Sequence, residues 1–518
     1  MLRPVPSRTQ ARWAALCGVV AGVLGIGVSD LVARLVSPTG SPLAAVGSLI
    51  INVLPAGMVN FGKDFLGVAD KPVLLTIVGL GVVALCGLGG VAELRNRGGG
   101  PALFAVVAAV GLISVAVGAG TDVKAYVPTV VGVLLASMLL VSLIGGLRRW
   151  QPARALRGPE GEEDPSRRRF LVMTGVWGGV AAAALVGGRL LVSAANRISD
   201  ARRNLTLPQA AKPAAPVPAG ADLRIPDLSP YITPNDDFYR IDTALQVPVI
   251  DPAAWSIRVT GMVEEEVEMT FEELLAQPLE EHVLTLTCVS NEVGGNLVGN
   301  AAWLGYPIRT LLERARPQQG ADMVLSRSED GFTASTPLEV LQDPDRACLL
   351  AVGMNGEPLP LEHGFPVRMV VPGLYGYVSA TKWVVNLKVT TFALDSGYWT
   401  PLGWSSKGPI KLSSRIDVPG GRVDAGTVAV AGVAWAQHTG IGSVEVQVDD
   451  GPWNPTELAE TTGPDTWRQW RYAWDAAPGD HRLTVRATDA KGEQQVAAEA
   501  PPAPDGATGY HSVRVTVR

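Results

Sequence analysis

The first third of the chain is a series of long apolar stretches, and the rest alternates apolar and polar residues over short distances. A membrane-spanning helix needs about 20 apolar residues. Four stretches contain no Asp, Glu, Lys or Arg, and a fifth begins directly after an arginine: 13–29, 72–92, 101–120, 125–147 and 170–192. We therefore expect residues 1–195 to form an α-helical transmembrane anchor with five spans.

A sixth apolar stretch, 43–62, is weaker because it contains two asparagines and a proline. Arginines flank the spans in the N-terminal tail, in the 93–100 loop and in the 148–169 loop, and basic flanks favour the cytoplasmic side. Five spans place all three on that side, so we expect 43–62 to be a re-entrant or interfacial segment on the outer side. The alternative is a plain sixth span that breaks the charge rule.

This charge pattern predicts a multi-pass protein of the cell membrane, with the chain beyond 170–192 outside the cytoplasm. Residues 166–171, Ser-Arg-Arg-Arg-Phe-Leu, precede the last apolar run. They resemble a twin-arginine export signal, and simple basic flanking explains them equally well. The export interpretation implies a cofactor protein, because that route carries proteins already folded, often around a cofactor.

The pattern changes after the last apolar run. Residues 196–233 are rich in Pro and Ala, which is typical of a linker. From 234 to 400, short β-rich runs alternate with helical pieces at 270–276 and 308–315, and Thr270 is placed to cap the first of them. This mixture predicts an α+β domain.

Residues 401–518 contain short runs in which apolar and polar residues alternate at period two. Turn signals such as Asp450-Gly451 and Pro478-Gly479 lie between them or follow them. Regular short strands without helices predict an all-β sandwich of the immunoglobulin-like type. The Cys-Trp-Cys core of antibody domains is absent from the sequence, so the prediction concerns the architecture alone.

Composition excludes several classes of protein. The 518 residues carry a net charge of −6, which gives no electrostatic case for nucleic acid. The four cysteines are too few for a disulfide scaffold of this length. The five histidines all lie beyond the apolar third, so that part cannot hold a haem between two histidines.

Cys288 stands at the end of a predicted strand and opens a loop rich in Gly and Asn. A thiol in this setting suits a metal ligand or a nucleophile, and a buried small hydrophobic residue is the plain alternative. His282 lies on the same strand and too far away to act as its base. A zinc site needs more Cys and His than the sequence offers, whereas one soft thiolate can bind a metal that a cofactor supplies. Cys348 is expected in the core.

A second group of polar residues lies within 354–383, where His363, Arg368 and Lys382 accompany several Gly and Pro. A histidine and an arginine five residues apart beside a glycine loop can bind a phosphate or another anion. The alternative is a surface hairpin that happens to carry charges.

These motifs resemble the sulfite oxidase family of molybdenum enzymes. The segment MNGEPLP-x-x-HGFPVR-x-VVPG is characteristic of that family, and Cys288, Asn291, Trp303 and STPLE at 335–339 fit it as well. The resemblance covers about 230–518. It implies an α+β molybdopterin domain of the sulfite oxidase type, followed by a sandwich that serves for dimerisation, so a homodimer is a possible assembly.

The resemblance also implies a molybdenum-molybdopterin cofactor whose metal is bound by Cys288, the catalytic ligand. It implies that the remaining matched residues contact the pterin or its phosphate. Those residues are Tyr239, Asp242, Thr243, Asn291, His363, Arg368, Ala380, Thr381 and Lys382.

The sequence departs from the family where sulfite is expected to bind. Ile241 and the Glu292-Val293 pair stand where the family has arginines, and Val352 stands where it has a tyrosine. Each lost charge-assisted hydrogen bond costs about 1.5–3 kcal/mol, which argues against sulfite as the substrate. No haem-binding domain precedes the molybdenum part, so the redox partner is expected to be another protein.

The sequence therefore predicts a membrane-anchored, extracytoplasmic molybdopterin-dependent oxidoreductase that performs two-electron oxygen-atom transfer, not on sulfite. One alternative is a reductase of sulfoxides, such as methionine sulfoxide in proteins. Another is a non-catalytic surface protein that retains the fold. A transporter is disfavoured because the predicted spans carry so little charge.

Overall fold

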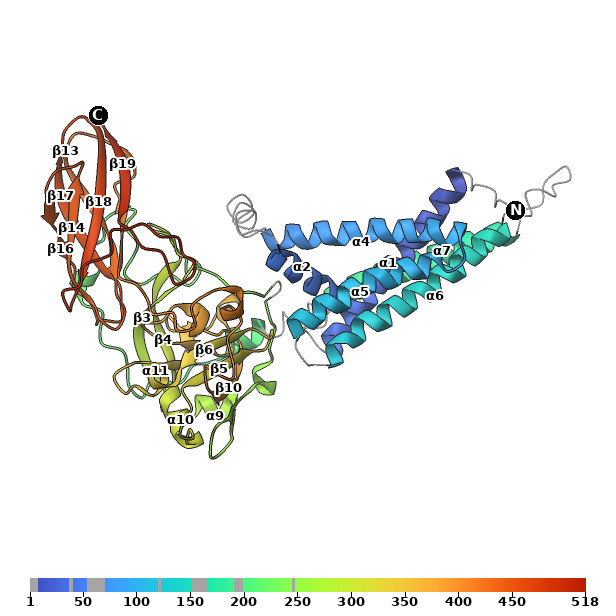
Figure 1. Cartoon of the computed structure of the whole chain (residues 1–518), viewed down its shortest axis with the longest axis horizontal. Coiled ribbons are helices and arrows are strands. Elements are labelled where there is room, and N and C mark those ends of the chain that lie inside the picture. Colours follow the sequence, from blue (N-terminus) through green and yellow to red (C-terminus); the bar gives the residue numbers. More distant parts are fainter. Residues whose placement is uncertain are drawn as a thin grey trace. The chain divides into compact units, whose positions relative to one another are not determined.

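The computed structural model describes residues 8–36, 41–53, 70–119, 123–150, 165–190, 199–244 and 247–518. The chain divides into two units, which are described separately. The first comprises Met1–Arg197 with Thr243–Gln246, and the second comprises Ile198–Asp242 with Val247–Arg518. The first unit is helical, and the second consists mainly of β-sheets (Figure 1).

The helices of the first unit correspond to the predicted apolar stretches. They are α1 Arg8–Val36, α2 Pro42–Val53, α4 Asp70–Arg95, α5 Gly99–Ala119, α6 Val127–Trp150 and α7 Pro165–Leu190. Within the described residues, four stretches are long and apolar enough to cross a membrane: Arg8–Ala33, Val73–Arg95, Gly99–Ala116 and Val123–Arg149. They match the first four predicted spans.

The fifth predicted span and the weak sixth stretch have a different outcome. The span predicted at 170–192 lies on α7, but its described apolar part, Phe170–Ala181, is shorter than a membrane-spanning segment. The stretch predicted at 43–62 begins as α2, and residues 54–62 lie outside the described residues. The re-entrant or interfacial placement of this stretch therefore stays a prediction.

Helices α1 and α4 approach each other closely at glycines. A Cβ atom at Gly18 would collide with the carbonyl oxygen of Cys86, and one at Gly90 would collide with that of Ala14. Helices within lipid pack through such small residues because these allow the backbones to come together. These glycines therefore allow the two helices to pack closely.

The α+β part of the second unit contains two sheets. One has the order β2-β1-β10-β5-β6, and the other has the order β3-β4-β7-β8, with β9 paired to β7. The strands are β1 Ser256–Gly261, β2 Val267–Thr270, β3 Glu280–Thr287, β4 Val298–Pro307, β5 Met323–Ser328, β6 Thr333–Pro337, β7 Leu349–Met354, β8 Glu357–Pro358, β9 Arg368–Val370 and β10 Val384–Thr390. Three short helices join them: α9 Phe271–Leu275, α10 Ile308–Ala315 and α11 Leu338–Gln342.

Local sequence explains where the first helices of this part begin. Thr270 caps α9 in a reciprocal capping box, because its hydroxyl accepts from the Glu273 N–H at 3.3 Å and the Glu273 carboxylate accepts from the Thr270 N–H at 2.8 Å. Helix α10 has the bounds predicted from the sequence. The main hydrophobic core includes Cys348, which is 2% exposed as expected for a core residue.

Residues 413–518, called here the C-terminal β unit, form two further sheets. Their orders are β11-β13-β17-β16 and β12-β19-β18-β14-β15. The strands are β11 Ser413–Val418, β12 Gly421–Val423, β13 Gly426–Trp435, β14 Ile441–Val448, β15 Trp453–Pro455, β16 Glu457–Leu458, β17 Arg468–Ala476, β18 Gly479–Asp489 and β19 His511–Val517. Both sheets contribute to one hydrophobic core, which includes Val430, Val446 and Trp470. The predicted β architecture is present, and its immunoglobulin-like type stays a prediction.

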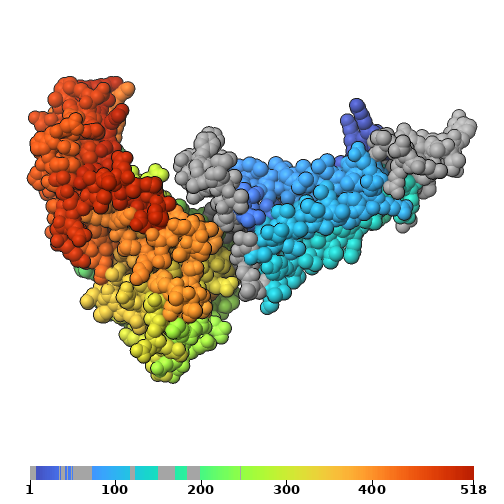
Figure 2. Space-filling model, viewed as in Figure 1, coloured from blue at the N-terminus to red at the C-terminus, as the bar shows by residue number. Residues whose placement is uncertain are grey.

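The segment predicted as a linker packs against both parts of the second unit. Tyr231 is 1% exposed, and its hydroxyl lies 3.0 Å from that of Thr466. The Tyr231 carbonyl accepts from Asn300 Nδ2 at 2.8 Å and from Trp467 Nε1 at 2.9 Å. Residues 205–233 therefore join the α+β part to the C-terminal β unit, and the two parts form one continuous body in Figure 2.

Candidate active site

Cys288 lies directly after β3 and opens a loop, residues 288–297, called here the cysteine loop. The Cys288 N–H donates to the Leu297 carbonyl at 2.9 Å, and the Cys288 carbonyl accepts from the Asn291 N–H at 3.0 Å. The side chain is buried, with 8% of the residue exposed. The end of β3 and the start of β4 thus hold the thiol at the edge of their sheet.

Asn291 shapes the cysteine loop from inside. Its Oδ1 accepts from the Leu297 N–H at 2.8 Å. A Cβ atom at Gly295 would lie 2.6 Å from the same oxygen, so only glycine leaves room for this hydrogen bond. Asn291 therefore stabilises the conformation of the loop that begins at Cys288.

Arg368 begins β9, and its guanidinium is buried among carbonyl groups. It donates to the carbonyls of His363 at 3.2 Å, Met369 at 3.3 Å and Ala380 at 3.5 Å. Its Cζ lies 5.1 Å from the centroid of the Trp303 ring. Burial lowers the pKa of Arg368 to about 10, so the group stays cationic at neutral pH.

Lys382 brings a second cation to the same place. Its Nζ donates to the Glu362 carbonyl at 2.8 Å and pairs with Asp242 Oδ2 at 3.2 Å. Burial lowers the pKa of Lys382 to about 8, and the Asp242 carboxylate opposes that shift. The residues predicted at 242 and 382 are therefore in direct contact.

His363 lies close to both cations and is 3% exposed. Burial, followed by the charges of Lys382 and Arg368, lowers its pKa to about 3, so the ring is neutral at neutral pH. Its Nδ1 is buried and has no hydrogen-bond partner among the described residues. His363, Arg368 and Lys382 are called here the cation cluster, after the charge that two of them carry.

Tyr239 is influenced electrostatically by both Arg368 and Cys288. Burial raises the pKa of its hydroxyl, the Cys288 thiolate adds to this effect and the Arg368 guanidinium opposes it. Both groups therefore lie within electrostatic reach of the Tyr239 hydroxyl. The ring stacks on Phe238 with 5.2 Å between centroids, and Phe238 in turn meets His363 edge to face at 5.7 Å.

The remaining predicted residues differ in their placement. Thr381 is fully buried, and its hydroxyl lies 2.7 Å from that of Ser326. Ala380 takes part through its carbonyl, as described for Arg368. Thr243 is half-buried and groups with the first unit, so its predicted role stays a prediction.

A small cavity of about 20 Å³ borders the cysteine loop. This volume is enough for one water molecule. Glu292 is the charged residue among the described residues that line it. The lining also includes Asn291, Gly294, Tyr375, Ser413, Ser414 and Gln495.

The three departures from the family do not all reach this cavity. Glu292 lines it and is exposed, and Ile241 is 41% exposed. Val352 is fully buried in the main hydrophobic core on β7. The placement of Val352 in the substrate pocket therefore stays a prediction, and its side chain packs in the same core cluster as Tyr375.

Sequence reasoning missed three residues of this region. Tyr375 is buried, which raises its pKa to about 12, and Cys288 contributes to that shift. Trp303, seen only as part of a motif, faces Arg368. Arg415 of the C-terminal β unit reaches the cysteine loop, and no local pattern marks it because 120 residues separate it from Gly295.

Comparison with known proteins gives a consistent assignment. Residues 244–399 match the oxidoreductase molybdopterin binding domain. The chain is 29% identical over 311 residues to the mitochondrial sulfite oxidase of Drosophila melanogaster, covering 50% of this chain and 53% of that protein. It is 32% identical over 197 residues to the inducible NADH nitrate reductase 1 of Glycine max, covering 32% of this chain and 22% of that protein.

Among solved structures, the sulfane dehydrogenase SoxCD of Paracoccus pantotrophus is 21% identical, with a TM-score of 0.49, covering 56% of this chain and 84% of that one. The chain spans about half the length of the curated sulfite oxidases of animals that it matches. The matched region contains Cys288, the cation cluster and the MNGEPLP segment. Residues 244–399 therefore form an oxidoreductase molybdopterin-binding domain, and about half of the chain is similar to the sulfite oxidases of animals.

Proposed function

We propose that this protein is a membrane-anchored, extracytoplasmic oxidoreductase that transfers oxygen atoms at a molybdenum bound by Cys288. The observation that carries the proposal is the burial of Arg368 and Lys382 beside His363, with Tyr239 in electrostatic reach of both Arg368 and Cys288. Buried cations are costly unless an anion accompanies them. Lys382 has the Asp242 carboxylate beside it, whereas the described hydrogen bonds of Arg368 go to carbonyl oxygens, so the surroundings of Arg368 favour an additional anionic group.

The described residues fit the phosphate end of a molybdopterin. Lys382 shares one carboxylate, that of Asp242, which Arg240 Nε also contacts at 3.2 Å. Arg368 meets carbonyl oxygens, and His363 Nδ1 has no partner among the described residues. A phosphate supplies strong acceptors for such donors, so this cluster can hold the cofactor.

The cofactor, when bound, supplies a two-electron redox centre that accepts or donates an oxygen atom. The protein contributes the soft thiolate of Cys288 as a ligand. Arg368 and Lys382 would hold the phosphate by charge-assisted hydrogen bonds, and the neutral ring of His363 would lie beside them without adding charge. The cysteine loop sets where the sulfur points, and the buried walls around it limit the access of water.

The charge of the cysteine loop favours a neutral substrate over sulfite. A dianion must leave its water, and the loop presents the acidic, exposed Glu292 four residues after Cys288. A sulfoxide carries no net charge and does not meet that repulsion. We therefore propose sulfoxides, including methionine sulfoxide in proteins, as the candidate substrate class.

Membrane anchoring and the outer location rest on the apolar helices and the arginine-rich loops. Reporter fusions at residues 160 and 215 should lie on opposite sides of the membrane if α7 completes a span. Reporters on the same side would contradict this topology. A separate redox protein and a homodimer through the C-terminal β unit complete the proposal.

The decisive experiment is a metal and pterin analysis of the purified full-length protein. About one molybdenum and one molybdopterin per chain are expected, since one thiolate and one cation cluster are available. Purified folded protein that never acquires molybdenum in a host that makes the cofactor would favour the non-catalytic alternative.

The substrate proposal needs its own assay on molybdenum-replete protein. Sulfite oxidation and sulfoxide reduction are compared side by side with dye mediators in low-salt buffer, where charge repulsion is least screened. Sulfoxide turnover should exceed sulfite turnover, and Glu292→Gln should raise the sulfite rate. Efficient sulfite oxidation that is insensitive to Glu292 would refute the proposed specificity.

A further inference from the structure

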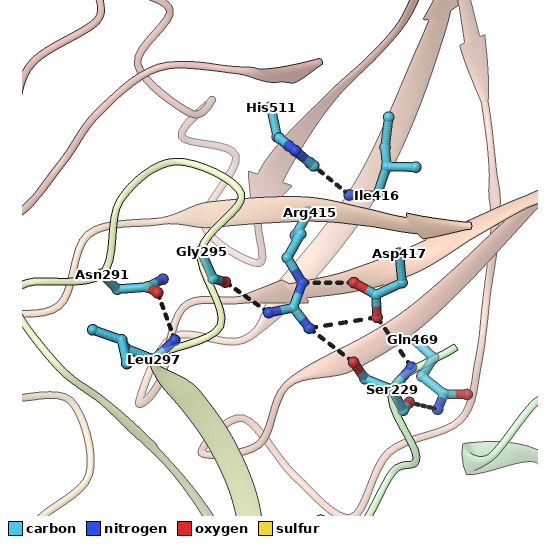
Figure 3. Close-up of polar contacts among 9 residues, drawn as sticks. All are labelled: Ser229, Asn291, Gly295, Leu297, Arg415, Ile416, Asp417, Gln469 and His511. Carbon is cyan, nitrogen blue, oxygen red and sulfur yellow. Dashed lines mark hydrogen bonds and ion pairs between the residues drawn. The ribbon is translucent and has the colours of Figure 1, made fainter. Parts of the chain in front are cut away.

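The C-terminal β unit reaches the cysteine loop through one arginine. Arg415 lies on β11, and its Nη1 donates to the Gly295 carbonyl at 2.7 Å (Figure 3). The residue is 8% exposed, so this contact is buried. It joins positions that are 120 residues apart in the sequence.

Two other groups hold the guanidinium in place. Arg415 Nε donates to Asp417 Oδ1 at 2.6 Å, and Nη2 donates to Ser229 Oγ at 2.8 Å. Asp417 Oδ2 accepts from the Ser229 N–H at 3.1 Å, which ties the three residues together. Because a guanidinium is planar and its donors are fixed, these contacts direct the remaining donor at Gly295.

A second side chain of the same unit lies against the neighbouring loop residue. A Cβ atom at Gly294 would collide with the His511 ring, and Gly294 also has a φ of +77°, which favours glycine. The His511 Nδ1 accepts from the Ile416 N–H at 3.0 Å, which orients the ring (Figure 3). The C-terminal β unit therefore contacts two consecutive residues of the cysteine loop.

The loop transmits this restraint to the thiol by a short path. Gly295 packs on Asn291 Oδ1, which accepts from the Leu297 N–H. The Leu297 carbonyl accepts from the Cys288 N–H. A shift of the Gly295 carbonyl therefore changes the backbone that places Cys288 Sγ.

We propose that Arg415 is a positioning residue for the metal ligand, acting through Gly295 and the cysteine loop, so that the C-terminal β unit is part of the active site. This inference rests on the proposed function, because it assigns Arg415 to the geometry of the Cys288 ligand. Arg415 itself touches neither the thiol nor the cation cluster in the contacts described.

The test variant is Arg415→Gln combined with Asp417→Asn in the full-length protein, because removing the arginine alone would leave a buried carboxylate unpaired. The matched control is Arg471→Gln with Glu457→Gln. That pair joins β17 to β16 of the same unit through two exposed contacts of 2.8 and 2.9 Å, away from the loop.

The first readout is amide hydrogen exchange, which requires no cofactor. Exchange of the peptide that covers 288–297 should become faster in the Arg415 variant and remain unchanged in the control. The second readout is kcat per bound molybdenum, which should fall by up to about 10²-fold, since displacement of a reacting group by about 1 Å has that effect. Arg415→Lys, which can keep one donor near Gly295, should retain part of the rate.

The outcomes separate the two proposals. If the wild-type protein binds no molybdenum, the proposed function fails, and the exchange experiment still decides whether Arg415 restrains the loop. Unchanged exchange in the Arg415 variant overturns the inference. The inference is also overturned if the Arg415 variant loses activity only in proportion to its loss of molybdenum, because Arg415 then serves to retain the cofactor.

Discussion

The surroundings of Cys288 and Cys348 differ although both cysteines flank strands of the same sheet and both are buried. Cys348 precedes β7, packs in the main hydrophobic core and donates from Sγ to the Val340 carbonyl at 3.3 Å. Burial raises the pKa of its thiol to about 12. Cys288 follows β3 and lies within electrostatic reach of Tyr239 and Tyr375, beside a loop with a polar cavity.

The comparison shows that burial alone does not distinguish Cys348 from Cys288, the proposed metal ligand. Thiolates act as ligands where polar or charged groups accompany them, whereas a thiol in an apolar core is inert. A strand end followed by a glycine-rich loop provides such groups at Cys288. At Cys348, a strand start packed in the main hydrophobic core, burial is the largest influence on the thiol, and charged groups act on it less strongly.

The largest difference is expected when each of the two cysteines is substituted. Cys288→Ser should leave the fold intact and abolish activity, because a hydroxyl is a poor soft ligand for the metal. Cys348→Ala should keep activity and molybdenum content. Both are measured on purified protein by turnover and metal analysis, and full activity of Cys288→Ser would remove the distinction between the two thiols.

A smaller effect is expected at the cation cluster. Arg368→Ala removes charge-assisted hydrogen bonds worth about 1.5–3 kcal/mol, so molybdopterin affinity should fall by about 10- to 100-fold. Pterin extraction after purification measures the occupancy. Lys388→Ala is the control, because Lys388 lies on β10, outside the cluster, and its Nζ pairs with Asp395 Oδ2 at 2.8 Å. The assignment would be refuted if molybdopterin occupancy equalled that of the wild-type protein in all three variants, Arg368→Ala, Lys382→Ala and His363→Ala.

The cluster should also give a pH dependence. The pKa of Lys382 is lowered to about 8, so its Nζ is charged below that pH and neutral above it. Affinity of the cofactor-free protein for inorganic pyrophosphate should therefore be retained below pH 8 and decrease as pH rises through that value. Isothermal titration calorimetry measures this affinity at each pH. The Lys382→Gln variant should bind pyrophosphate more weakly, and its affinity should not decrease near pH 8. A step that persists in Lys382→Gln would assign it to another group.

The smallest effect is expected in stability at the structural thiol. Cys348→Ala removes one buried sulfur atom from the core, which should lower the free energy of unfolding by about 1 kcal/mol. Thermal unfolding of the purified protein measures it. A loss of several kcal/mol would indicate that Cys348 does more than fill space.

Sequence patterns predicted the elements because their signals are local. Helix α10 has its predicted bounds, and the capping box at Thr270 is read directly from residues three positions apart. The period-two runs became β13, β14, β17, β18 and β19 for the same reason. The span predicted at 170–192 stays a prediction, because the described apolar part of α7, Phe170–Ala181, is shorter than a membrane-spanning segment.

The sequence by itself determined that a thiol stands at a strand end, that a glycine-rich loop follows it, and that His363, Arg368 and Lys382 accompany a family motif. Only the tertiary structure decided that Lys382 meets Asp242, that Val352 faces the core and that Arg415 reaches Gly295. The physical reason is distance along the chain. A capping residue or a strand period acts on its own neighbours, whereas a contact between residues 120 or 140 positions apart exists only after sheets and loops have packed.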